Sequence, residues 1–199
     1  MEAGFLSYTI LILIWTGFGF MHSLLANNSV KHFFKKLSGY YFGYYRLAYN
    51  LFNLFFIAGA LFFQFSIVEN RLFELTNSLL GISILFTTTG LIIMFLSIYK
   101  LDLAEMSGTK KYKMEKSGNQ LVTEGLYKYI RHPLYFGTIL LFPAFIIFAG
   151  TLSMIIMVIC FISYLLIAIP IEEKKLEIEF GLDYTNYKKN VKKLIPFIY

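Results

Sequence analysis

The sequence predicts an all-α membrane protein with five transmembrane helices, a C-terminal helical hairpin and a cytoplasmic amphipathic tail helix. Apolar residues make up 57% and charged residues 15% of the 199 residues, against roughly 45–50% and about 25% in soluble domains. Several apolar runs have the length of a helix that crosses a bilayer, about 20 residues. The basic residues lie in the gaps between these runs. This position of the basic residues is typical of a membrane protein, whereas the net charge of +6 alone could also suggest a nucleic-acid-binding protein. We therefore expect the lipid bilayer as a partner and no nucleic acid.

The N-terminal half contains three apolar runs, which predict spans over about 5–25, 47–68 and 78–99. The first run follows a start that lacks the positive region and the cleavage site of a secretory signal, so we interpret it as a retained helix. A polar, aromatic connection joins the first two spans, and its tyrosines are typical of a membrane interface.

The C-terminal half begins with the longest polar segment, Lys100 to His132. Two apolar runs follow, over 133–149 and 151–171, and only Gly150 separates them. So short a connection requires an antiparallel helical hairpin. The first of these two spans is short and contains Pro143.

The tail continues the last span with a helical pattern up to Gly181, a typical residue for the end of a helix. Asp183 is a candidate cap for a short amphipathic helix that runs to Leu194 and is closed by Pro196. The single cysteine, Cys160, lies inside an apolar run and predicts packing, with no disulfide and no cysteine metal cluster.

The distribution of Lys and Arg predicts the orientation. Three connections, those after the first, third and last spans, hold 17 of the 18 basic residues, and the link after the second span holds one. The positive-inside rule then puts the N-terminus outside and the C-terminus in the cytoplasm, with the inner membrane of a bacterium as the expected location. Polar residues from four spans share the cytoplasmic depth: His22, Arg46, Tyr49, Asn50, Arg131, His132, Glu172 and Glu173.

The stretch Leu121–Gly137 joins the long polar segment to the hairpin. Pro133 disfavours a helical conformation at His132 and suits the first turn of a helix, so we predict a turn followed by a helix that begins at Pro133. Arg131 and His132 are thereby held at a helix entrance at the membrane boundary. An interfacial anchor explains the same residues without chemistry.

Two other features have both a functional and a structural interpretation. Glu172 and Glu173 directly follow an apolar run, where carboxylates are costly and suggest a functional partner. They either oppose Arg131 and His132 or mark the end of the helix. His22 is a packing residue, a catalytic residue or a haem ligand. No second histidine lies at metal-ligand spacing on its helix, so no metal site is predicted.

Sequence signatures of soluble nucleotide-binding folds and of common hydrolases are absent, namely GxGxxG, GxxxxGK[ST], HExxH and GxSxG. The motifs that are present resemble another class. The segment LVTEGLYKYIRHPLYFG, the Glu pair one hairpin later and FGLDYTNY follow the order found in the isoprenylcysteine carboxyl methyltransferase-type family of integral membrane methyltransferases. In the N-terminal half, HSLLA, the Arg46 to Asn50 entry to the second span and the closing LIP resemble the nurim-like branch, which contains bacterial methanethiol S-methyltransferases.

The resemblance implies a single domain, 1–199, with the acceptor side in 1–99 and the S-adenosylmethionine side in 100–199. It implies that eight residues shape the cofactor pocket: Gly125, Tyr127, His132, Pro133, Tyr135, Gly137, Glu172 and Glu173. Arg131, Glu173 and His22 are the expected catalytic residues, and His22, Tyr49 and Asn50 the expected acceptor residues.

The expected reaction is methyl transfer from S-adenosylmethionine to a small or lipophilic thiol such as methanethiol, at the cytoplasmic face. A prenylcysteine carboxylate or a lipid amine is the second acceptor that the resemblance allows. Two interpretations from different classes stay open, a haem-binding isomerase with His22 as axial ligand and a non-catalytic nurim-like membrane protein.

Overall fold

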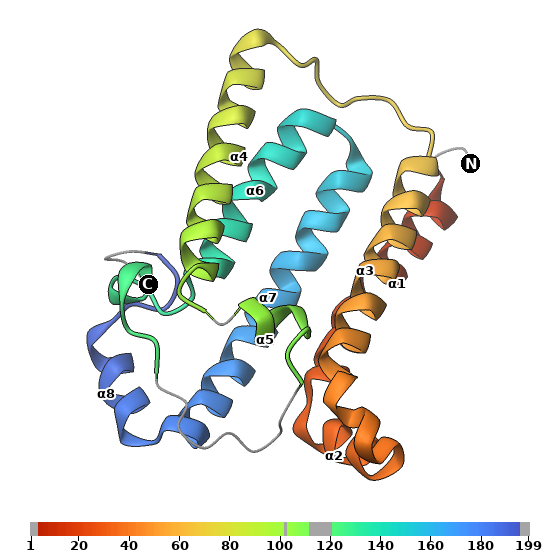
Figure 1. The fold of residues 1–199 in the computed structure, drawn as a ribbon. Helices are drawn as coiled ribbons and strands as arrows, with labels where there is room; N and C mark the ends of the chain where they lie inside the picture. Colours follow the sequence, from red (N-terminus) through yellow and green to blue (C-terminus); the bar gives the residue numbers. More distant parts are fainter. Residues whose placement is uncertain (1–3, 102, 112–120, 196–199) are drawn as a thin grey trace.

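The structure, a computed structural model, describes residues 4–101, 103–111 and 121–195. Within these ranges the chain forms α-helices and two short 3-10 helices and no β-strand beyond one isolated bridge, so the all-α class is confirmed. Figure 1 shows the helices as an elongated bundle, with both α1 and α3 on one side and α4, α6 and α7 on the other.

Four helical stretches are long and apolar enough to cross a membrane. They are α1 (Phe5–Ala26), the stretch that ends in α3 (Tyr45–Ser66), α4 (Asn77–Ile98) and α7 (Leu152–Phe180). The helix α6 (Pro133–Ala149) is apolar but has 17 residues, fewer than a full crossing requires. Four spans are therefore supported, and the fifth stays a prediction.

The connection between the first two spans is helical, a feature that the sequence pattern did not reveal. Asn27 caps α2 (Asn28–Ser38), because its side chain accepts a hydrogen bond from the Ser29 amide at 2.8 Å. The 3-10 helix η1 (Gly39–Tyr44) then leads into α3. Along α2 the apolar residues recur at Val30, Phe33, Phe34 and Leu37, the spacing of a helix that lies in a membrane interface.

The core joins α1 to α7 through large apolar side chains, among them Leu11 and Trp15 of α1 and Met157, Val158 and Leu165 of α7. The helices α4 and α6 approach each other through glycine. A Cβ atom built on Gly90 would lie 2.8 Å from the Gly137 carbonyl oxygen, closer than side chains pack. Small residues at such contacts let membrane helices pack closely.

The hairpin of α6 and α7 turns at Gly150, which adopts the left-handed conformation with φ 64°. The α3–α4 link binds both ends of this turn. Arg71 Nη2 donates to the Phe148 carbonyl at 2.9 Å, and the Leu72 amide donates to the Gly150 carbonyl at 2.7 Å. Glu69 Oε2 accepts from the Ser153 amide at 3.2 Å, in the first turn of α7.

The tail differs in part from the prediction. As expected, α7 ends at Phe180 before Gly181, which has φ 55°. The next helix, α8 (Leu182–Asn190), ends four residues before the predicted Leu194, and Pro196 lies outside the described residues. The chain after α8 is extended because it pairs with the segment before α6: the Arg131 and His132 amides donate to the Lys192 and Lys193 carbonyls at 2.8 and 3.1 Å.

Candidate active site

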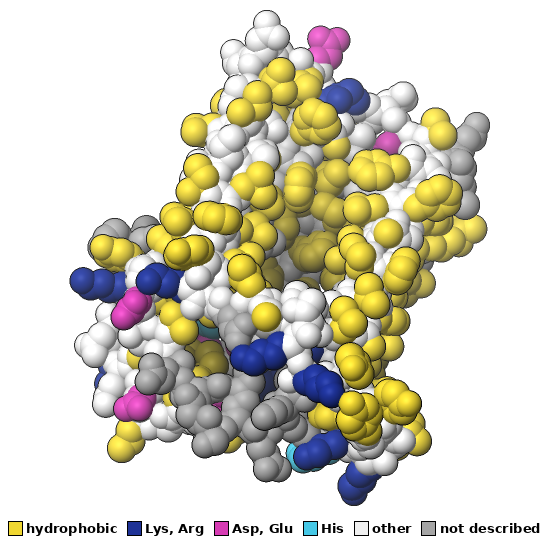
Figure 2. Space-filling model, viewed as in Figure 1, with side chains coloured by type: hydrophobic (Ala, Val, Ile, Leu, Met, Phe, Trp, Pro, Cys, Tyr) yellow, Lys and Arg dark blue, Asp and Glu magenta, His cyan; other side chains and the backbone are white. Residues whose placement is uncertain are grey.

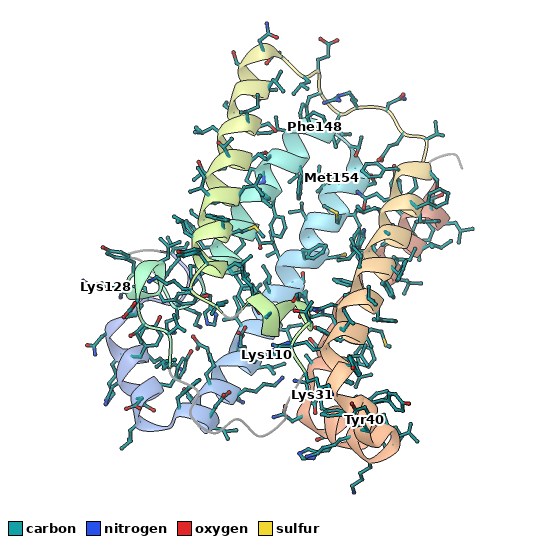
Figure 3. The ribbon with its side chains drawn as sticks, in the orientation of Figure 1. Lys31, Tyr40, Lys110, Lys128, Phe148 and Met154 are labelled. Atoms are coloured by element: carbon teal, nitrogen blue, oxygen red, sulfur yellow. The ribbon has the colours of Figure 1, made fainter. Side chains whose placement is uncertain are left out.

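One end of the bundle encloses a cavity of about 720 Å³, at the end where α1 and α7 finish and α3 and α6 begin. Its lining comes from α1, α2, α3, α6 and α7 and from the short helix α5 (Leu103–Ser107). Lys31 of α2 lines the cavity. In Figure 3, Lys31 and Lys110, which follows α5, both lie in the lower half of the molecule. The cavity therefore joins the N-terminal and C-terminal halves of the chain.

The face of α7 toward the cavity follows the helical period. Tyr164, Ala168, Glu172, Lys175 and Glu179 recur at intervals of three and four residues, and all of them line the cavity. Glu172 thus faces the cavity, whereas Glu173, one position further along the helix, is buried on another side with 4% exposure.

Glu172 is oriented by a tyrosine of the RHP segment. The Tyr135 hydroxyl donates to Glu172 Oε2 at 2.6 Å, the distance of a strong bond to a charged acceptor. Tyr135 sits in the first turn of α6 because that helix begins at Pro133, as predicted. His132 has φ −123° and ψ 59°, outside the helical region, and its ring stacks on Tyr135 with centroids 5.6 Å apart.

His22 lines the cavity and belongs to a hydrogen-bonded group with α3. Its Nδ1 lies 3.0 Å from Asn53 Oδ1, and the Tyr49 hydroxyl lies 3.0 Å from Nδ1 and 2.9 Å from Nε2. The Asn53 amide nitrogen donates to the Tyr49 carbonyl at 2.7 Å, which turns Asn53 Oδ1 toward the ring. Because that oxygen only accepts, Nδ1 carries the proton and Nε2 holds a lone pair.

Arg131 and Glu173 form a buried ion pair beside the cavity, with their side chains 6% and 5% exposed. Arg131 Nη2 and Nε donate to Glu173 Oε1 at 2.7 and 2.9 Å, and His132 Nε2 lies 3.2 Å from the same oxygen. Arg131 also donates to the Lys188 and Val191 carbonyls at the end of α8. The pair therefore joins α7, the RHP segment and the tail.

The remaining residues of the predicted cofactor set do not belong to the lining. Pro133 is buried, and Gly137 lies in the contact between α4 and α6. The Tyr127 carbonyl accepts a hydrogen bond from the Tyr187 hydroxyl at 2.6 Å, which ties the segment to α8. Gly125 has φ 62° and lies against the side chain of Lys100.

Burial is the largest cause of the pKa shifts of His132 and Tyr127. It lowers the pKa of His132 below its usual value, although the charges of Glu172 and Glu173 act in the other direction. Burial and, to a smaller extent, the charge of Glu172 raise the pKa of Tyr127 to about 12. His132 is thus neutral in the folded protein at neutral pH, and its Nε2–H donates to Glu173.

The structure brings together His22, Tyr49, Asn50, Tyr135 and Glu172 of the predicted residues. Asn50 lines the cavity while its side-chain amide donates to the carbonyls of Met106 and Ser107. Sequence reasoning missed Tyr164 and Lys175, which lie eight residues before and three after Glu172. That spacing was the available signal, since it puts both on the face of Glu172.

These features define a membrane enzyme site, in which apolar helices carry a carboxylate and a histidine into one cavity. Residues 77–182, just over half of the chain, match the phospholipid methyltransferase family. The chain belongs to this family and is a membrane methyltransferase.

The similar curated proteins come from the same class. Methanethiol S-methyltransferase 2 of Bradyrhizobium diazoefficiens is 26% identical over 193 residues, which cover 94% of this chain and 73% of that protein. Methanethiol S-methyltransferase of Crocosphaera subtropica is 33% identical over 121 residues, 55% of this chain and 44% of that protein. The chain thus spans about three quarters of the first relative and under half of the second. No solved structure matches the chain.

Proposed function

We propose that the protein transfers a methyl group from S-adenosylmethionine to a small or lipophilic thiol, of the methanethiol type, at the cytoplasmic face of a bacterial inner membrane. The observation that carries this proposal is the shared cavity. It is lined by His22 and Tyr49 of the N-terminal half and by Tyr135 and Glu172 of the C-terminal half. The similarity to methanethiol S-methyltransferases supports the choice of acceptor.

The residues present fit the cofactor. The cavity of about 720 Å³ is within the usual range for small-molecule sites, roughly 300–1,000 Å³. Glu172, Tyr135 and Tyr164 offer a carboxylate and aromatic rings to a cation, and Lys31 and Lys175 offer positive charge to a carboxylate. When bound, S-adenosylmethionine supplies a methyl group activated by its sulfonium charge.

Glu172 and Tyr135 act as the binding and orienting pair. The Tyr135 hydroxyl fixes one carboxylate oxygen of Glu172 at 2.6 Å, so the charge of Glu172 is held at one place in the wall. Methyl transfer requires an in-line approach of donor and acceptor, and a fixed binding group contributes by positioning. We propose that Arg131, Glu173 and His132 support this geometry from behind the wall, since their contacts are with one another and with the tail.

His22 is the group that receives the proton of the acceptor thiol. Its Nε2 carries the lone pair because Asn53 holds the proton on Nδ1. The thiol proton would pass to Nε2, which would leave a thiolate able to accept the methyl group that S-adenosylmethionine would supply. The Tyr49 hydroxyl, 2.9 Å from Nε2, marks the place where an acceptor thiol would bind.

The test measures ligand binding and turnover with the purified protein. S-Adenosylmethionine and its demethylated product should both raise the melting temperature, and methanethiol should be converted to dimethyl sulfide. His22→Ala should reduce this conversion at least tenfold and leave the affinity for S-adenosylmethionine within about threefold, well under the 1.4 kcal/mol of a tenfold change.

His32→Ala is the matched control, because His32 lies exposed on α2. Normal turnover of His22→Ala with methanethiol would remove His22 from the chemistry. Absence of any thermal response to both S-adenosyl compounds would contradict the proposed function itself.

A further inference from the structure

The segment Leu103–Lys111 forms a separate wall of the cavity. It contains α5, which lies between α7 and α3 in Figure 1, and Met106 of α5 lines the cavity. The segment closes on itself, because the Lys110 amide and the Thr109 hydroxyl both donate to the Ala104 carbonyl, at 2.9 and 3.2 Å. It therefore behaves as one small unit.

Asn50 attaches this unit to α3. Its amide nitrogen donates to the Met106 carbonyl at 2.8 Å and to the Ser107 carbonyl at 2.9 Å. These are the last two residues of α5, where the carbonyls have no partner within the helix. Both N–H bonds of the Asn50 amide are thus directed at the end of α5.

Two further contacts lie on the same side of the unit. Gly108 is buried with φ 80°, and a Cβ atom at this position would lie 2.7 Å from Leu47 Cα, so only glycine fits against α3. Lys111 Nζ donates to the Tyr40 hydroxyl at 2.9 Å and lies 4.7 Å from the centre of that ring. All of these contacts attach the unit to η1 and the first turns of α3.

We propose that Asn50 is a positioning residue that holds α5 in place as a wall of the cavity, and that this wall retains the bound S-adenosyl ligand. Asn50 acts on the ligand through Met106, which it fixes by the backbone. The inference rests on the proposed function. It predicts that release of the α5 segment weakens S-adenosyl binding without unfolding the bundle, because the segment adds no side chain to the buried apolar core.

The first measurement follows the position of α5 directly. A cysteine at Met106, in a protein in which Cys160 is replaced by alanine, reports access through its rate of labelling by a water-soluble thiol reagent. Asn50→Asp keeps the size of the side chain but sets a carboxylate against two carbonyl oxygens. We expect labelling to become about tenfold faster or more, as the loss of two hydrogen bonds implies.

Gly108→Ala tests the same wall from another contact and should accelerate labelling in the same way. Asn186→Asp is the matched control, since it makes the same chemical change on the exposed side of α8. Its labelling rate should equal that of the parent protein.

The second measurement is the affinity for the demethylated product of S-adenosylmethionine, by calorimetry, with the natural Met106 and Cys160 in place. Asn50→Asp and Gly108→Ala should each weaken binding about tenfold, while Asn186→Asp does not. A purely structural role would lower the melting temperature and the active fraction and leave the affinity of the active fraction unchanged.

Unchanged labelling in Asn50→Asp and Gly108→Ala would overturn the proposal, because α5 would then be held by other contacts. Faster labelling with unchanged affinity would also overturn it, since the wall would not retain the ligand. If the parent protein binds no S-adenosyl compound, the proposed function fails, whereas the labelling rates still decide whether Asn50 holds α5.

Discussion

Glu172 and Glu173 are neighbours in the chain but have different surroundings. Glu172 lines the cavity and accepts a hydrogen bond from Tyr135, whereas Glu173 is buried against Arg131. A helix turns about 100° per residue, so the two adjacent glutamates point in different directions. We therefore propose that the two glutamates have different roles: Glu172 is available to a ligand in the cavity, and Glu173 holds the RHP segment and the tail together.

Substitution of each glutamate should separate these roles. Glu173→Gln leaves Arg131 buried without a counter-charge, which typically costs about 3–5 kcal/mol, so we expect a large loss of stability in equilibrium unfolding in mild detergent. Glu172→Gln should leave stability nearly unchanged and weaken S-adenosylmethionine binding at least tenfold. Equal effects of both changes on both measurements would contradict the division.

His132 predicts a pH dependence of stability. Burial holds its pKa in the folded protein below the usual 6.5, so the folded state binds fewer protons than the unfolded state as the pH falls through that value. Stability should therefore decrease from about pH 6.5 downward, until the folded state is protonated as well. His132→Gln should reduce this slope, measured by unfolding between about pH 7.5 and pH 5. The same slope in both proteins would show that other groups cause it.

At the scale of elements, glycine decides how α4 and α6 meet. A Cβ atom on Gly137 would lie 2.7 Å from the Met94 side chain and 2.9 Å from the Gly90 carbonyl oxygen. Gly137 was expected in the cofactor pocket, and its position in the contact between α6 and α4 gives it a packing role.

Gly137→Ala should therefore destabilise the protein by about 1–3 kcal/mol, the usual cost of overpacking. Gly81→Ala on α4 is the matched control, because nothing lies within 4 Å of a Cβ atom there. Thermal unfolding in detergent measures both. A stable Gly137→Ala protein that has lost its affinity for S-adenosylmethionine would contradict the packing role and support a role of Gly137 in the cofactor pocket.

The elements that sequence predicted best are those that the bilayer itself constrains. The apolar runs, the turn at Gly150 and the start at Pro133 follow from the length and local chemistry of the chain. The helix α2 was missed, although its apolar residues recur at helical spacing, because it is short and lies within a polar connection. Helix α8 was predicted too long, since Lys192 and Lys193 pair with a segment some 60 residues away.

The sequence could predict the depth of the site residues along the bundle, but not the direction in which each side chain points. Charge distribution and helix ends indicate that His22, Tyr49 and Glu172 lie at one end of the bundle, and all three line the cavity there. Which of two adjacent carboxylates faces inward depends on how α7 is rotated against α1, and this is fixed by core packing far from Glu172. The position of the Arg131 side chain likewise depends on its contact with the tail, which the sequence does not reveal.

At the scale of the whole molecule, apolar and charged side chains gather at different heights. Figure 2 shows hydrophobic side chains over the upper two thirds of the visible face, including a hollow between α3 and the group of α4, α6 and α7. Several Lys and Arg side chains gather near the lower end of this face. The distribution is that of a protein whose cavity end lies at the membrane surface.

The orientation prediction can be tested by labelling from one side. Single cysteines at the exposed positions Lys36, Glu74 and Leu182, in a protein in which Cys160 is replaced by alanine, should divide two to one. We expect Glu74 to react in intact cells, and the other two to react only after the cytoplasmic side is exposed. Labelling of Lys36 and Glu74 from the same side would show that the assignment of spans is wrong.

The cluster around Glu69 has a consequence for how the protein is made. Glu69 Oε2 accepts from the Tyr8 hydroxyl of α1 and from the Ser153 amide of α7, so the first and last spans meet at one carboxylate. The ribosome delivers Ser153 more than 80 residues after Glu69. The hydrogen bond from the Ser153 amide can therefore form only after the start of α7 has been synthesised, later than α4 and α6.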